Sequence, residues 1–119
     1  MALIPLHWAA MRHLFEYERP LVQYLFTQAG ASLEISALIV RPMSGGTGGL
    51  SIAPFSSSRK LGASPAECHF YDADGTPVSV VLNLDQAGKP FEIDIWRVDF
   101  QAVMSWPLER QILPGAPDR

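Results

Sequence analysis

Three stretches in the second half of the chain alternate apolar and polar residues, as β-strands with one buried face do. They cover residues 66–71, 78–85 and 91–96, and turns that contain Asp or Gly separate them. We therefore predict three antiparallel strands joined as a meander. One face of this meander carries Ala66, Cys68, Phe70, Val78, Val80, Leu82, Leu84, Phe91, Ile93 and Ile95.

The turns fix the register of the meander, because residues paired across two strands share a face. Matching the apolar faces pairs Phe70 with Val78 across a three-residue loop, 73–75, that ends in glycine. A type I turn followed by a left-handed glycine has this length. The second hairpin should pair Leu84 with Phe91, and this pairing requires a loop of even length.

The first half of the chain predicts an amphipathic helix over residues 18–29. Pro20 is tolerated in a first turn, where its missing N–H is not needed, and Gly30 suits the left-handed residue that ends a helix. The apolar residues at helical spacing are Leu21, Val22, Leu25, Phe26 and Ala29.

Two shorter strands are predicted between the helix and the meander. Residues 36–41 and 50–53 are the apolar segments, and the glycine run 45–49 between them indicates a hairpin tip. The chain then crosses a Ser-rich loop, 54–65. These elements predict an α+β fold in which one main N-terminal helix packs on one face of an antiparallel sheet of about five strands.

The segment after the meander is expected to complete the core. Asp99 could cap a short helical turn, and it could also pair with Arg97 or Arg12. Phe100 and Trp106 are expected to fold back onto a sheet edge.

Length and composition suit one domain. The chain has 119 residues, of which 48% are hydrophobic, which is enough for a core without metals or disulfides. We predict an N-terminal extension at residues 1–10, a single domain at 11–107 and a C-terminal tail at 108–119. From Pro114 onward we expect a loose chain.

Charge and hydropathy limit the kinds of molecule that the protein is expected to bind. The net charge is −3 and the basic residues are scattered, so the clustered basic face that nucleic acid requires is missing. No window reaches the ~20 apolar residues of a membrane helix. The single cysteine, Cys68, excludes an intrachain disulfide. We place the protein in the cytoplasm.

The face of the meander opposite the helix holds the candidate site. The register places His69 and Trp96 in one cross-strand row, Glu67 and Asp94 in the next, and Tyr71 on the same face. A carboxylate beside a histidine suits acid–base catalysis, but no second nucleophile or oxyanion donor accompanies it. Aromatic residues on an open sheet face are typical interface anchors. We therefore predict a binding surface at these five residues, with no catalytic residue.

Other candidate motifs have plainer explanations. Residues 72–75 (Asp-Ala-Asp-Gly) resemble the start of a calcium loop, but position twelve is Asn83 rather than a glutamate, so we predict a hairpin turn. Cys68 should point to the core, away from His69. The glycine run lacks the Lys-Ser/Thr of a phosphate loop. We predict no metal site and no cofactor.

Several short motifs together resemble a family of small, mostly bacterial domains of unknown function, over roughly residues 11–107. They are Met11-Arg12-His13-Leu14, Glu18 with the Leu-rich helix, Asp72–Gly75, Leu82–Gly88, Glu92–Phe100 and Trp106-Pro107. The family pattern has a Ser/Thr helix cap where this chain has Phe15. The resemblance implies no activity, cofactor or catalytic residue, and it implies that residues 1–10 lie outside the common domain.

Two functional hypotheses follow. The first is a non-enzymatic module that binds another protein through the sheet face or an exposed edge, as an antidote to a toxin or as an adaptor. The alternative is a small enzyme or metabolite-binding domain with a pocket around His69. We expect a monomer or a weak homodimer, since strand 50–53 is a candidate edge.

Overall fold

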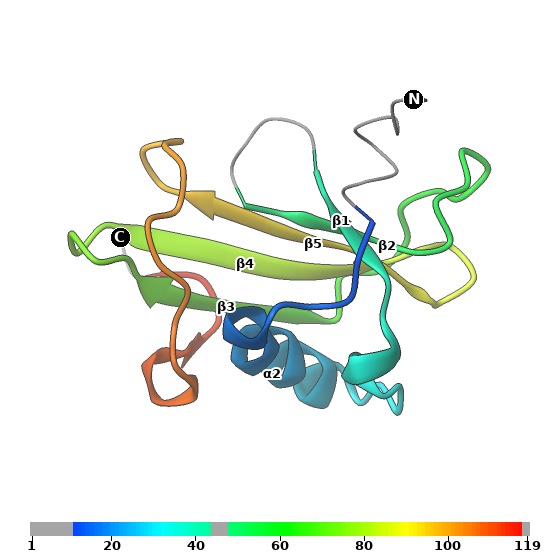
Figure 1. Ribbon diagram of the computed structural model, residues 1–119, viewed down its shortest axis with the longest axis horizontal. Coiled ribbons are helices and arrows are strands. Elements are labelled where there is room, and N and C mark those ends of the chain that lie inside the picture. Colours follow the sequence, from blue (N-terminus) through cyan, green and yellow to red (C-terminus); the bar gives the residue numbers. More distant parts are fainter. Residues whose placement is uncertain (1–10, 44–47, 118–119) are drawn as a thin grey trace, which may run out of the picture.

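An antiparallel sheet with one main helix on one face forms the fold (Figure 1). The computed structural model describes residues 11–43 and 48–117. Within them the strand order is β1-β2-β5-β4-β3-β6, which confirms the α+β class with six strands rather than about five. In chain order the elements are η1 (Glu16–Glu18), α2 (Arg19–Ala29), η2 (Ile35–Ala37), β1 (Val40–Pro42), β2 (Leu50–Ile52), β3 (Ala66–Tyr71), β4 (Pro77–Leu84), β5 (Pro90–Arg97), η3 (Glu109–Gln111) and β6 (Leu113–Pro114).

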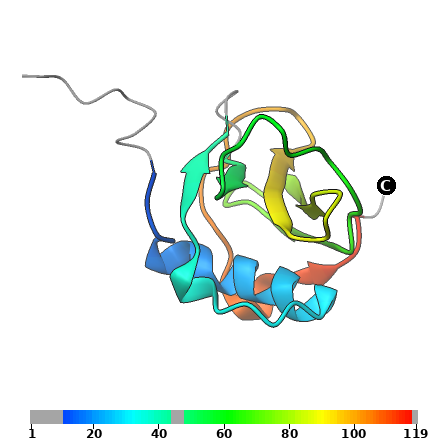
Figure 2. The same cartoon turned by 90° about the vertical axis from the view of Figure 1, so that its right-hand side faces the viewer.

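Helix α2 has the boundaries that its proline and glycine predict. Pro20 lies in the first turn, and Gly30 has a φ of 70° and donates its N–H to the last turn of the helix. The helix lies along one face of the curved sheet, against β3 and β4 (Figure 2). Its buried side chains are Leu21, Val22, Leu25 and Phe26. These side chains close the apolar core over the inward face of the meander.

The first hairpin has the predicted register. Phe70 pairs with Val78 across the loop 73–75, and Gly75 has the left-handed φ of 84° that this turn requires. Alternation then sends Cys68 and the other apolar residues of the meander inward. Eight of the ten residues of the predicted core face are buried; Leu84 is partly buried against the core, and Phe91 is not part of it.

The second hairpin differs from the prediction at its end. Its loop has three residues, 86–88, and Gly88 has a φ of 82°, so it repeats the turn of the first hairpin. Leu84 pairs with Pro90 instead of Phe91, and the register shifts there. With a loop of odd length alone, the apolar residues of β4 and β5 would face opposite sides of the sheet. A β-bulge that places one extra residue in β5 returns them to the same side. Beyond the bulge the predicted pairing holds.

The short strands also differ from the prediction. The segment 36–41 begins as the 3-10 turn η2, and only its end continues into β1. Strand β2 lies between β1 and β5, so the expectation that 50–53 forms a sheet edge is wrong. Arg12 exchanges two backbone hydrogen bonds with Val40, of 2.9 and 2.7 Å, and so covers part of the true edge at β1. Residues 44–47 of the predicted hairpin tip lie outside the described residues.

The C-terminal segment pairs with the sheet and is not the loose chain that we expected from Pro114 onward. Strand β6 pairs with the outer edge of β3, and the N–H of Gly115 donates to the carbonyl of Glu67 at 3.0 Å. Ile112, just before β6, is buried. An edge strand with free N–H and C=O groups gains by such pairing, and here the last described residues supply it. No helix in the described ranges is long and apolar enough to cross a membrane.

Candidate functional site

The face of the sheet opposite α2, which we call the polar face, contains a cleft of about 430 Å³. Its lining residues are Glu67, Pro77, Ser79, Trp96, Val98, Ala116 and Pro117. Ser79 of β4 pairs with Trp96 of β5 as predicted, and Glu67 lies in the neighbouring row. Two of the five predicted site residues, Glu67 and Trp96, therefore line one cleft.

His69 lies in the predicted row with Ser79 and Trp96, but it is covered where we expected it at the surface. It is only 8% exposed, and its Nδ1 lies 2.8 Å from the carbonyl oxygen of Gly115. The segment after β6 covers it. Tyr71 is about half exposed, and its ring meets the imidazole edge-on, with 5.9 Å between centroids. His69 thus helps to hold the C-terminal segment, and Tyr71 flanks the polar face outside the cleft.

Asp94 belongs to a group of polar side chains in the next rows. Asn83 donates to the carboxylate of Asp94 at 2.8 Å and to that of Glu92 at 3.2 Å. Its own carbonyl accepts a 2.6 Å bond from the hydroxyl of Ser64. Burial, together with the Asp94 charge, raises the pKa of Glu92. One neutral amide therefore joins two carboxylates that form no ion pair with a cation of residues 11–43 or 48–117.

Apart from Glu34 and Glu109, which lie on the outer side of α2, the described carboxylates fall into two groups. In the first, arginine pairs with the acid: Arg12 with Glu18, Arg19 with Glu16, Arg59 with Asp85, and Arg97 with Asp72, Asp74 and Asp99. In the second, on the polar face, Glu67, Glu92 and Asp94 form no ion pair with any described residue. The negative charge of the polar face is thus open to an external cation.

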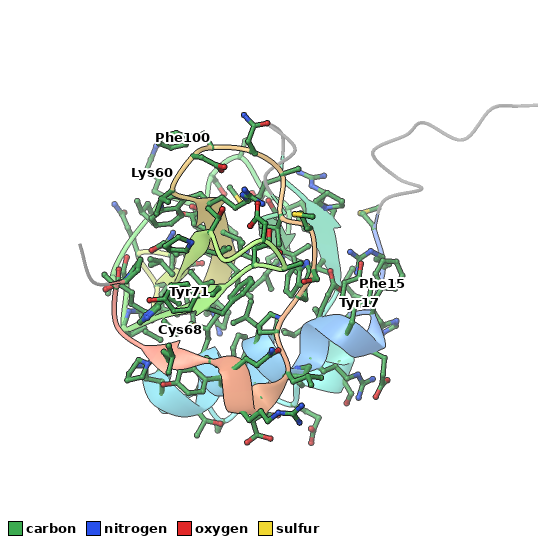
Figure 3. All side chains as sticks on the ribbon, turned by 90° about the vertical axis from the view of Figure 1, so that its left-hand side faces the viewer. Phe15, Tyr17, Lys60, Cys68, Tyr71 and Phe100 are labelled. Carbon is green, nitrogen blue, oxygen red and sulfur yellow. The ribbon has the colours of Figure 1, made fainter. Side chains whose placement is uncertain are left out.

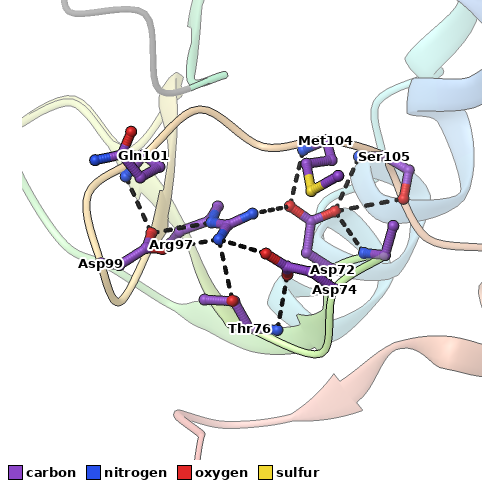
Figure 4. Close-up of polar contacts among 9 residues, drawn as sticks. Asp72, Asp74, Thr76, Arg97, Asp99, Gln101, Met104 and Ser105 are labelled. Atoms are coloured by element: carbon purple, nitrogen blue, oxygen red, sulfur yellow. Dashed lines mark hydrogen bonds and ion pairs between the residues drawn. The ribbon is translucent and has the colours of Figure 1, made fainter.

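The Arg97 cluster is the largest polar network, and it joins the first hairpin to the segment 98–107, which we call the strap (Figure 4). Arg97 is 5% exposed and lies 3.0 Å from Asp72, 2.8 Å from Asp74 and 2.7 Å from Asp99. The two predictions that this region allows, a hairpin turn and an Arg97–Asp99 pair, are confirmed. The arginine occupies the centre of the carboxylates, so this cluster has a structural role.

Asp72 holds the strap in place. Its enclosed carboxylate accepts bonds from the N–H groups of Met104 at 2.8 Å, Ser105 at 2.9 Å and Ala73 at 2.8 Å. Burial alone would raise the pKa of Asp72, but these donors and Arg97 together lower it below its usual value. The sequence showed Asp72 only as a turn residue, and nothing in its spacing pointed to a bond with a segment thirty residues away.

The strap itself does not form the helical turn that we predicted. The N–H groups of Met104 and Ser105 bond to Asp72, and that of Gln101 donates to Asp99 at 3.0 Å. Phe100 has a φ of 60° and is 76% exposed, so the expectation that it folds back is wrong. Figure 3 shows it at the rim of the molecule, away from the interior position of Cys68. Trp106 does pack against the core.

A larger hollow, of about 740 Å³, lies on the outer side of α2. Its lining mixes both signs of charge, with Arg19 beside the acidic Glu16, Glu34 and Glu109. A surface with both charges selects no particular partner charge. The cleft on the polar face has a single sign and an indole, so it is the more specific site.

A family model described as a domain of unknown function, DUF6984, matches residues 11–107. The chain belongs to this family. No curated protein and no solved structure matches the chain.

Proposed function

We propose that this member of the family is a non-enzymatic interaction module that binds a partner protein through the polar face of its sheet. The observation that carries the proposal is the cleft at Trp96, which combines an indole, the apolar Pro77 and Val98, and the carboxylate of Glu67. Tryptophan is enriched among the residues that dominate binding energy at interfaces. A cleft in which such a residue is already ordered needs little reorganisation on binding.

The groups that could perform chemistry have structural positions, and this favours binding over catalysis. Cys68 is fully buried, and burial raises the pKa of its thiol to about 12. His69 bonds to a backbone carbonyl and does not line the cleft. The alternative hypothesis, an enzyme or metabolite pocket around His69, therefore lacks its central residue at the cleft.

Capture of partners by the purified protein from an extract of its native host tests this proposal. We expect one partner at a stoichiometric ratio, retained by the wild type and lost with Trp96→Ser. Leu33→Ser is the matched control, because Leu33 is 52% exposed and follows α2, away from the polar face. Absence of a stoichiometric partner, or a partner that both variants retain equally, would overturn the proposal.

A further inference from the structure

We propose that the partner presents a lysine or arginine side chain that enters the cleft between Trp96 and Glu67. This inference rests on the proposed function and adds the chemistry of the ligand. A cation would find there a negative charge, an aromatic face and an open hydroxyl.

Charge complementarity is the first argument. Glu67, Glu92 and Asp94 share the polar face, and within the described residues no arginine or lysine pairs with them. Six other described acids pair with arginine, whereas Glu34 and Glu109, which lie on the outer side of α2, do not. Glu92 and Asp94 lie two residues apart on the same face of β5, where their charges repel each other, and Glu67 lies in the row of Asp94 on β3, with Val81 of β4 between them. A basic side chain from outside would remove this repulsion, and its attraction would be strongest at the Glu67 wall of the cleft.

The aromatic residues give a second, independent argument. The chain stacks its own arginines on three phenylalanines: Arg12 on Phe15 at 3.7 Å, Arg41 on Phe55 at 4.2 Å and Arg59 on Phe91 at 5.0 Å. Trp96 has no such cation among the described residues, although indole is the best of the aromatic faces for a cation. The cleft therefore offers an aromatic ring for the kind of cation–π contact that the described residues form three times among themselves.

Ser79 gives the third argument. Its side chain lines the floor of the cleft and is only 5% exposed. No hydrogen bond joins its hydroxyl to another described side chain. Among the described residues Ser79 is not one of the enclosed polar atoms that lack a partner, and an ammonium or guanidinium group in the cleft can donate to its oxygen. The volume of about 430 Å³ lies at the lower end of the ~300–1,000 Å³ of small-ligand sites, so the cleft has room for a side chain.

Nuclear magnetic resonance titration with a short peptide tests the inference. The probe is a pentapeptide with one central lysine between serine and glycine residues and with blocked ends, and the comparison peptide is identical except that its lysine is acetylated. At low salt we expect the lysine peptide to shift the indole N–H signal of Trp96 and the amide signals of Glu67 and Ser79. The acetylated peptide should leave them unchanged, and high salt should weaken the effect.

Variants identify the contacts. Glu67→Gln should weaken peptide binding about fivefold, as expected for loss of one charge contact. Trp96→Leu keeps an apolar side chain and should weaken it about tenfold by removing the aromatic face. Glu109→Gln is the control, since Glu109 is an exposed carboxylate outside the cleft and should leave binding unchanged. Unchanged amide spectra away from the cleft show that each variant is folded.

Equal shifts with both peptides, or no shift at millimolar lysine peptide, would overturn the inference. Shifts that appear only after truncation behind Pro117 would also overturn it, because they would show that Arg119 of the same chain is the occupant. These outcomes concern only the cation, and the capture experiment with Trp96→Ser tests the proposed function. A partner that is lost with Trp96→Ser and retained with Glu67→Gln would support the module and reject the cation.

Discussion

Asp72→Asn should be among the most destabilising conservative substitutions in the protein. The enclosed carboxylate faces five donors: Arg97 at 3.0 Å, the N–H groups of Ala73, Met104 and Ser105, and the hydroxyl of Ser105 at 3.4 Å. An amide turns an NH₂ group toward at least one pair of these donors in either orientation. It also leaves Arg97 with less negative charge while that side chain is still 5% exposed.

The magnitude follows from the burial of this pair. Removing one partner of a buried ion pair costs about 3–5 kcal/mol. Arg97 retains Asp74 and Asp99, so we expect a loss at the lower end, about 3 kcal/mol. For a domain of this length the melting temperature should fall by about 12 °C. The strap should also loosen, since Met104 and Ser105 lose their acceptor.

Urea unfolding followed by circular dichroism at neutral pH measures this loss. Asp74→Asn is the control, because it removes the same charge beside the same arginine from a side chain that is 42% exposed. It should cost clearly less. Equal losses for Asp72→Asn and Asp74→Asn, or no loss for Asp72→Asn, would refute the reasoning that burial of the carboxylate sets the cost.

The pH dependence gives a further check on Asp72. Its pKa is lower in the folded state than in the unfolded chain, so its contribution is complete above the unfolded value of 3.8 and declines as the pH falls below it. The neighbouring Asp74, with its pKa lowered to about 2, titrates in the same direction. The difference in stability between the wild type and Asp72→Asn should therefore shrink as the pH falls below 3.8.

Three further predictions concern other parts of the molecule. Glu92→Gln should raise the melting temperature slightly at neutral pH, because burial and Asp94 raise the pKa of this carboxyl; the gain should vanish below pH 4.5, its ordinary value, where Glu92 is protonated anyway. Gly62→Ala should lower the urea midpoint by the equivalent of about 2 kcal/mol, since a Cβ there would meet the backbone of Asp85; an unchanged midpoint would contradict this close contact. Cys68 should resist iodoacetamide at neutral pH until urea unfolds the protein, and mass spectrometry should detect no adduct before that, because burial raises the pKa of its thiol to about 12.

The residues of the meander that point toward the core could be predicted from the sequence, because apolar and polar residues alternate along each strand. One pairing, Phe70 with Val78, sets the inward or outward direction of every residue in the first hairpin. Pro20 and Gly30 likewise fixed the ends of the helix, since each residue restricts φ in a way that suits only one helix terminus. Local stereochemistry was sufficient for both.

The bulge and β6 could not be predicted, because neither has a local signal. An even loop and an odd loop followed by a bulge place the same side chains on the same faces, so the apolar pattern cannot distinguish them. Strand β6 has two residues, one of them Pro114, and it exists because the edge of β3 needs partners. Its absence from the prediction is also the reason that His69 was expected at the surface.

The candidate site was predicted in part for the same reason. Register placed Glu67 and Trp96 on one face, and the structure brings both to one cleft. The walls from Val98 and Pro117 come from segments whose paths depend on the Arg97 network and on β6. Such contacts join residues far apart in sequence, and the order of apolar and polar residues within one segment does not reveal them.

The carboxylates that pair with arginine and those on the polar face have different expected effects on stability and on binding. An aspartate that is paired with a buried arginine acts within the fold, so its removal should lower stability, as for Asp72. A carboxylate without a cation, such as Glu92, costs stability in the isolated protein because of repulsion and burial. Proteins commonly keep such unfavourable groups where function requires them. If Glu92→Gln stabilises the protein and Glu67→Gln weakens binding of the lysine peptide without a loss of stability, the charge of the polar face serves a partner. If both variants are less stable than the wild type, these acids belong to the fold and the case for the cleft as a cation site fails.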